Sequence, residues 1–98
     1  MEARIREEMF NLGILSNKRG YIYIIKAVKR FNSSITMEEI YNNIASTVGK
    51  SRCAVEGSIR TAIKSADHDL SAWKNYDCLT TRGFIAAMYY RCKESANE

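Results

Sequence analysis

No proline interrupts this chain of 98 residues, and glycine occurs only five times. Proline breaks a helix and glycine weakens one, so no segment of the chain is barred from the helical conformation. Apolar side chains also recur at intervals of three and four residues along most of the chain, which is the spacing of one helical face. The sequence therefore predicts an almost entirely helical fold.

Several segments carry this helical pattern. The first covers residues 4–12 and ends at Gly13, and the second covers residues 18–31. The letters YIYII in the second segment favour a strand when taken alone, but the residues after them continue the helical period. Residues 69–76, with Trp73 as an anchor, add one or two turns. Together with the three helices described next, they predict an all-α compact bundle of about five or six helices.

A helical hairpin is predicted at about residues 36–66. Thr36 stands three residues before Glu39, which forms a capping box whose hydroxyl and carboxylate each bond a free backbone N–H. Gly49 supplies the positive φ that a tight turn requires, and Ser51 caps the helix that follows. A further helix begins at Thr80 or Thr81 and contains the apolar side chains Phe84, Ile85, Met88 and Cys92.

The hairpin has the spacing of a helix-turn-helix. Ala45, four residues before the turn glycine, is small enough for the second helix to approach, and Val55 holds that helix on the core. Residues 51–66 are then the recognition helix, which lies in the major groove of DNA in such motifs. Charged and hydroxyl side chains recur on the side of this helix away from the core. They are Lys50, Ser51, Arg52, Glu56, Arg60, Thr61 and Lys64.

These side chains suit DNA. Arginine bonds guanine through two hydrogen bonds, a carboxylate accepts from the cytosine amino group, and cations or hydroxyls meet phosphates. The four-residue spacing is also that of surface ion pairs along a helix, so a solvated face is the alternative. The formal net charge of +4 favours an anionic partner only weakly. A second basic cluster either contacts phosphates beside the hairpin or keeps the chain soluble. It comprises Lys18, Arg19, Lys26, Lys29 and Arg30.

Other classes of function lack a motif. The sequence has no P-loop, no glycine-rich dinucleotide turn, no HExxH and no nucleophile elbow, so we expect no catalysis, no cofactor and no small-molecule substrate. Three scattered cysteines and His68 lack the spacing of zinc ligands, and reduced thiols are the better interpretation. No apolar run is long enough to span a membrane, and the charged N-terminus is unlike a secretory signal, so a cytoplasmic protein is expected.

Three stretches over about residues 8–93 also resemble a known family. They are Leu12-Gly13 with Gly20-Tyr21-Ile22-Tyr23, then Ser34-Ile35-Thr36 with Tyr41, Ile44-Ala45, Val55-Glu56, Ile59-Arg60 and Ala62-Ile63, and finally Thr80 with Phe84-Ile85-Ala86. In order and approximate spacing they are similar to the C-terminal DNA-binding effector domain of stage zero sporulation protein A, a bacterial response regulator of sporulation.

The resemblance implies an all-helical domain of about six helices that reads a short box of double-stranded DNA and pairs head to tail on it. Glu56 and Arg60 match positions that contact DNA in the family. Ala54, Gly57 and Thr61 stand where the family tends to place Arg, Arg and His, which puts the family's own target sequence in doubt. Residues 1–98 are expected to form a single domain without the family's receiver domain.

The last helix carries the candidate dimer contacts Phe84, Met88 and Tyr89. Tyr89 is adjacent to Tyr90, so one of the two must point away from the core, and a partly exposed tyrosine is the alternative to a dimer surface. The sequence as a whole predicts a regulator of transcription that binds duplex DNA in a sequence-specific way. The alternative is a degenerate relative that modulates a full-length regulator through protein–protein contacts of its final helix.

Overall fold

The computed structural model describes residues 2–14, 19–64 and 81–96, which form five helices and no strand. The helices are α1 (Glu2–Asn11), α2 (Arg19–Arg30), α3 (Met37–Val48), α4 (Arg52–Lys64) and α5 (Thr81–Ala96). The predicted all-α fold is therefore confirmed, and each predicted helix that lies in these ranges is present. The predictions for Lys18, Ala66, His68, Cys78, Thr80 and the stretch around Trp73 lie outside the described residues.

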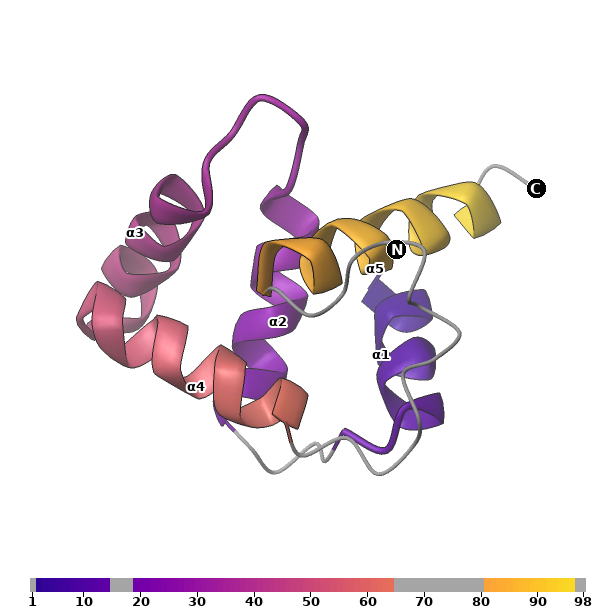
Figure 1. The fold of residues 1–98 in the computed structure, drawn as a ribbon, viewed down its shortest axis with the longest axis horizontal. Coiled ribbons are helices and arrows are strands. Elements are labelled where there is room, and N and C mark those ends of the chain that lie inside the picture. The colour runs from indigo at the N-terminus through magenta and orange to yellow at the C-terminus, as the bar shows by residue number, and fades with distance from the viewer. Residues whose placement is uncertain (1, 15–18, 65–80, 97–98) are drawn as a thin grey trace.

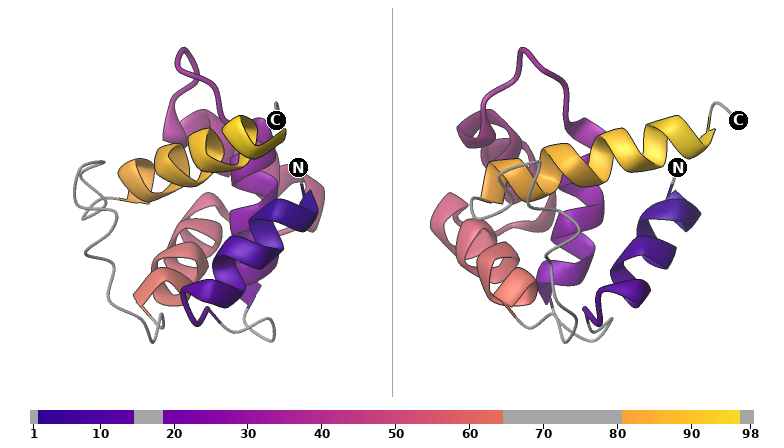
Figure 2. Two further views of the ribbon diagram at one scale, coloured as in Figure 1. Left: turned by 90° about the vertical axis from the view of Figure 1, so that its right-hand side faces the viewer. Right: turned by 45° about the vertical axis from the view of Figure 1, so that its right-hand side comes forward.

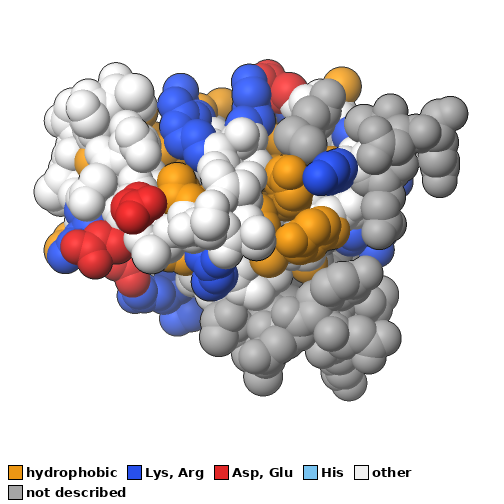
Figure 3. All heavy atoms as spheres, turned by 90° about the horizontal axis from the view of Figure 1, so that it is seen from above, with side chains coloured by type: hydrophobic (Ala, Val, Ile, Leu, Met, Phe, Trp, Pro, Cys, Tyr) orange, Lys and Arg blue, Asp and Glu red, His pale blue; other side chains and the backbone are white. Residues whose placement is uncertain are grey.

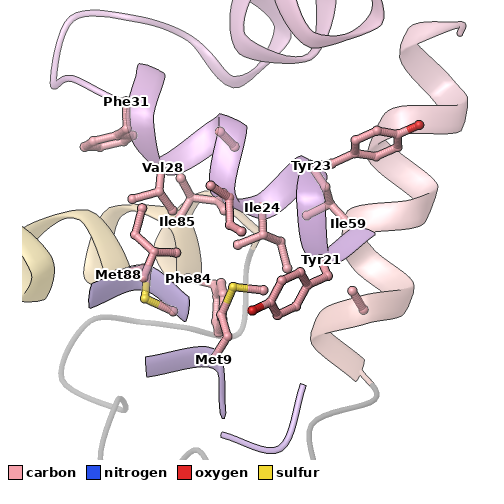
Figure 4. Packing of buried hydrophobic residues seen from close by; sticks show 14 of the residues in the cluster. Met9, Tyr21, Tyr23, Ile24, Val28, Phe31, Ile59, Phe84, Ile85 and Met88 are labelled. Carbon is pink, nitrogen blue, oxygen red and sulfur yellow. The ribbon is translucent and has the colours of Figure 1, made fainter. Parts of the chain in front are cut away.

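The central helix is α2, which contacts all four other helices and packs most extensively against α4 (Figures 1 and 2). Figure 4 shows Ile24 and Val28 of α2 facing the side chains of α5, while Tyr23 lies towards Ile59 of α4. Burial on several sides explains why the letters YIYII are helical, since tertiary packing overrides strand propensity. The Cα radius of gyration is 12.5 Å, which is close to the roughly 13 Å expected of a compact domain this size.

Gly20, in the first turn of α2, sets how closely α4 approaches. A Cβ at this position would lie 2.0 Å from the carbonyl oxygen of Ser58 and 2.6 Å from the Cβ of Ala62. Neither neighbour is the end of a flexible side chain, so only glycine fits here. The position of α4 on the core therefore depends on a residue of α2.

The helix ends of the hairpin are capped by the two hydroxyls and the glycine that the sequence predicts. The hydroxyl of Thr36 accepts a hydrogen bond from the backbone N–H of Glu39 at 3.1 Å. Gly49 has a φ of 69° and donates its N–H to the carbonyl of Ala45. The hydroxyl of Ser51 accepts from the N–H of Ala54 at 3.1 Å, which caps α4. The turn between α3 and α4 is thus fixed by the left-handed Gly49 at the end of α3 and by the Ser51 cap at the start of α4, while Thr36 caps the far end of α3.

Replacing Thr36 with alanine should lower the free energy of unfolding by about 1 kcal/mol, because the N–H of Glu39 loses its acceptor. Thr47→Ala is the matched control. Thr47 is exposed inside α3 and its hydroxyl only donates to the carbonyl of Ile44, so alanine there should leave stability unchanged or raise it slightly. Urea denaturation followed by circular dichroism measures both variants, and equal stabilities would contradict the capping role.

One acidic side chain is buried away from the hairpin. Glu8 is 4% exposed, and its carboxylate pairs with Arg4 at 2.9 Å and with Arg91 at 3.2 Å. The pair with Arg91 joins α1 to α5, while the pair with Arg4 lies within α1. Burial raises the pKa of the nearby Cys92 thiol, and the Glu8 carboxylate raises it further, so this cysteine stays protonated.

Candidate nucleic-acid interface

The two sides of α4 differ sharply in exposure. Val55, Ile59 and Ala62 are fully buried against the neighbouring helices. Six of the seven predicted DNA-contact residues are exposed, namely Lys50, Ser51, Arg52, Arg60, Thr61 and Lys64. Figure 1 shows α4 at the periphery of the fold, beyond α2. The structure therefore leaves these six residues accessible around α4 and the turn before it, and together with Glu56 we call them the α4 face.

The seventh predicted residue, Glu56, is half-buried. Four residues advance a helix by a full turn and about 40° more, so a row at this spacing winds gradually around α4. The row begins at Arg52 close to α3 and ends at Lys64 on the outer side. The first half of the row therefore runs along the edge of the buried side of α4. The sequence pattern had suggested that the whole row lies directly opposite the buried side.

Both arginines of the row are held in ion pairs. Arg60 pairs with Glu56 at 2.7 Å, four residues earlier in the same helix. Arg52 pairs with Glu38 of α3 at 2.6 Å, a contact that the spacing within α4 does not predict. Lys50 and Lys64 make no ion pair with any other residue that the structure describes. The α4 face is thus basic overall, with two of its cations partly neutralised by acids.

Tyr41 of α3 lies beneath this face and is 6% exposed. Burial raises the pKa of its hydroxyl, and the nearby Glu56 carboxylate raises it further. The tyrosine therefore remains neutral at physiological pH, and only lysine, arginine and glutamate side chains set the charge of the α4 face.

A shallow groove separates the outer side of α4 from the start of α2. It is lined by Arg19, Gly20, Cys53, Ala54, Gly57, Ser58, Thr61 and Ala62. The exposed Arg19 therefore flanks the α4 face, although the sequence placed it in a separate basic cluster. Its proximity follows from Gly20, which brings the start of α2 against α4. The space beside Gly57 is open, since a Cβ there would meet nothing within 4 Å.

The rest of the second basic cluster lies elsewhere. Lys26, Lys29 and Arg30 line a separate depression with Glu2 and Arg6. Glu2 pairs with Lys29 at 3.2 Å and with Arg6 at 3.1 Å, and hydrogen bonds from these two cations, Lys29 first, hold the pKa of Glu2 below its usual value. On the side seen in Figure 3, basic side chains are scattered between hydrophobic and acidic ones. The cluster predicted from the sequence is therefore divided between two surfaces.

The candidate dimer contacts on α5 need correction. Phe84 and Met88 are 0% exposed and point into the core beside α2 (Figure 4), so they offer no surface to a partner in this conformation. The apolar pattern of α5 could not show this, because it does not reveal that other helices cover α5 from two sides. Tyr89 is half-buried, while Tyr90 is exposed as the adjacency of the tyrosines required. The rings of Phe31 and Tyr89 lie 5.2 Å apart between centroids.

The described part of the chain contains neither a cluster of metal ligands nor a membrane-spanning helix. Cys53 is an exposed thiol and Cys92 a buried one, and no three histidine, cysteine or acidic residues within the described ranges gather as metal ligands. Among the described helices, none has the length and hydropathy needed to cross a membrane.

The sequence of the chain matches a known protein family. The family model described as "Sporulation initiation factor Spo0A C terminal" matches residues 5–90. The match spans α2 and the helical hairpin, and it covers most of α1 and α5. No curated protein and no solved structure matches the chain.

Proposed function

The chain belongs to the Spo0A C-terminal domain family, whose members are DNA-binding regulators of transcription, and from that premise we propose that α4 enters the major groove of duplex DNA and reads its sequence. The observation that carries the proposal is the α4 face. Its cations and hydroxyls are exposed on the second helix of a capped hairpin, while the other side of the helix is fully buried. This arrangement is that of a recognition helix.

The residues of the α4 face have different roles in this proposal. Glu56 and Arg60 are the candidates for base contacts, since guanidinium and carboxylate groups distinguish guanine and cytosine in the major groove. Lys50, Arg52, Thr61 and Lys64 meet phosphates at the edges. The oxygen of Ser51 caps α4, which leaves its proton free to donate to a phosphate oxygen. Arg19 extends the phosphate contacts across the groove beside α4.

The family is not catalytic, and we propose neither a reaction nor a cofactor for this chain. We propose that residues 1–98 act as one DNA-binding unit in the cytoplasm and that a second copy binds beside it on DNA. The alternative is a module that modulates a full-length regulator through its last helix. Of the residues predicted for the surface of such a module, only Tyr89 is accessible, because Phe84 and Met88 are buried.

Duplex DNA should slow the alkylation of Cys53. This exposed thiol lies on α4 beside Arg52, so DNA seated on the α4 face would cover it. The buried Cys92 is an internal reference whose slow reaction should not change. The measurement is the rate of labelling by iodoacetamide with and without saturating duplex, read for each cysteine by peptide mass spectrometry.

The outcome separates the α4 face from other surfaces. Protection of Cys53 by several-fold, with no change at Cys92, would support the proposal. An unchanged Cys53 rate at a DNA concentration that saturates binding would mean that another surface holds the DNA. Faster labelling of Cys92 would indicate that DNA unfolds the core, and would contradict the proposed rigid docking.

A further inference from the structure

The ion pair between Glu38 and Arg52 joins the two helices of the hairpin at an unexpected point. Glu38 lies in the first turn of α3, and Arg52 is the first residue of α4. Their side chains meet at 2.6 Å. The Arg52 side chain must therefore extend back along α3, because the start of α4 lies next to the end of α3, at Gly49. Its guanidinium is drawn towards the start of α3 and away from the outer side of α4.

Both partners of this pair are open to solvent. The Arg52 side chain is 44% exposed and that of Glu38 is 67% exposed. An exposed ion pair of this kind is weak, since water screens the attraction. A DNA phosphate is a strong competitor for the same guanidinium, because arginine binds phosphate oxygens through two parallel hydrogen bonds. The ion pair therefore holds the Arg52 guanidinium near Glu38 in the free protein, and a DNA phosphate can displace the Glu38 carboxylate.

The second acidic contact on the α4 face differs in this respect. Glu56 and Arg60 lie on the same helix, so they keep their spacing wherever α4 docks. Glu38 is on α3, the helix that crosses the DNA backbone in a helix-turn-helix. Its carboxylate therefore competes with phosphate for Arg52 from the side of the hairpin at which the backbone passes.

Resting on the proposed function, we propose that Glu38 restrains Arg52 in an ion pair that DNA must break, so that this acid lowers the affinity of the α4 face for DNA of any sequence. The pair keeps one cation out of non-specific phosphate contacts. Glu38 is on this account a positioning residue that acts through Arg52 and makes no favourable contact with DNA itself. A protein with this restraint would depend more on its remaining base contacts to stay on a site.

Glu38→Gln tests this inference, and the chain provides a close control in Glu39→Gln. Glu39 is the next residue, also lies in the first turn of α3 and makes no ion pair with a described residue. Both substitutions remove one negative charge and one favourable contact with the helix N-terminus. A difference between the variants therefore reports on Arg52 and not on net charge.

The measurement is fluorescence anisotropy of the full chain on a labelled duplex and on its scrambled version over a series of salt concentrations. Glu38→Gln should bind both duplexes about two- to fivefold more tightly than Glu39→Gln, which is the range that an exposed ion pair can contribute. Its slope of log K against log salt should match that of Glu39→Gln, because Arg52 reaches the same phosphate in both complexes. In an Arg52→Ala background the two glutamine variants should bind equally.

Other results overturn the inference in distinct ways. Equal affinities of Glu38→Gln and Glu39→Gln would show that only net charge matters. Weaker binding by Glu38→Gln would show that Glu38 holds Arg52 in a productive position. If the wild-type chain and all variants, each folded by circular dichroism, bind no DNA even at low salt, the proposed function fails and the inference with it.

Discussion

Gly20→Ala should lower the free energy of unfolding by about 1–3 kcal/mol, the usual cost of an extra methyl group in a packed contact. The new Cβ would lie 2.0 Å from the carbonyl oxygen of Ser58, so α2 and α4 would have to move apart. That movement would disturb the contact through which the central helix holds α4. Because 1 kcal/mol corresponds to about 4–8 °C for a domain this size, the melting temperature should fall measurably.

Gly57→Ala, on the outer side of α4, should have the opposite effect on the free energy of unfolding. Nothing lies within 4 Å of a Cβ at Gly57, and the residue sits in the interior of α4. Alanine there should raise stability by roughly 0.5–1 kcal/mol, because glycine is the weaker helix former. The two substitutions add the same atoms to the same chain and should change stability in opposite directions.

Thermal and urea denaturation of the two variants beside the wild type measures this contrast. Similar stabilities of Gly20→Ala and the wild type would mean that α2 and α4 are not seated as closely as the structure places them. Destabilisation by Gly57→Ala would mean that the outer side of α4 is covered. Either result would remove the geometry on which the α4 face depends.

Arg60→Ala should weaken DNA binding by about tenfold or more. A lost arginine contact in the major groove costs about 1–3 kcal/mol, and the substitution has a second effect. Glu56, which now pairs with Arg60 at 2.7 Å, would be left as an unpaired acid beside the polyanionic DNA. Repulsion of that carboxylate adds to the loss, while the fold should be unaffected because Arg60 is exposed.

Arg6→Ala is a matched control for this substitution. Arg6 is an exposed arginine that also pairs with a glutamate four residues earlier in its helix, Glu2, at 3.1 Å. It lies on α1 and not on the α4 face. Its removal changes net charge equally and should reduce affinity only slightly at physiological salt, where screening acts within about 8 Å. Equal losses for the two variants, measured by anisotropy, would assign the binding to overall charge.

Much of the fold follows from local features of the sequence. The hydroxyl cap at Thr36, the turn at Gly49 and the cap at Ser51 each depend on residues within four positions of one another, and all three are found in the structure. The helical period likewise identifies the buried residues of the amphipathic helices. Such signals are readable because the interactions that produce them are close in sequence.

What the sequence did not predict depends on which helices meet. The role of Gly20 appears only when α4 lies across α2, and the pairing of Arg52 with Glu38 requires the crossing of α3 and α4. Phe84 and Met88 were assigned to a dimer surface because an apolar row on a helix looks the same whether it faces the core or a partner. The structure places both in the core.

The central claim is that this chain binds duplex DNA through the α4 face, and a salt titration of the wild-type chain tests it most directly. Fluorescence anisotropy would follow two labelled duplexes, one with the box of sporulation regulators and one with the same bases scrambled. The account predicts saturable binding whose log K falls linearly with log salt. The slope should lie between zero and about −4.5, the limit reached if Arg19, Lys50, Arg52, Arg60 and Lys64 each neutralise one phosphate. No binding to either duplex at the lowest salt would contradict it.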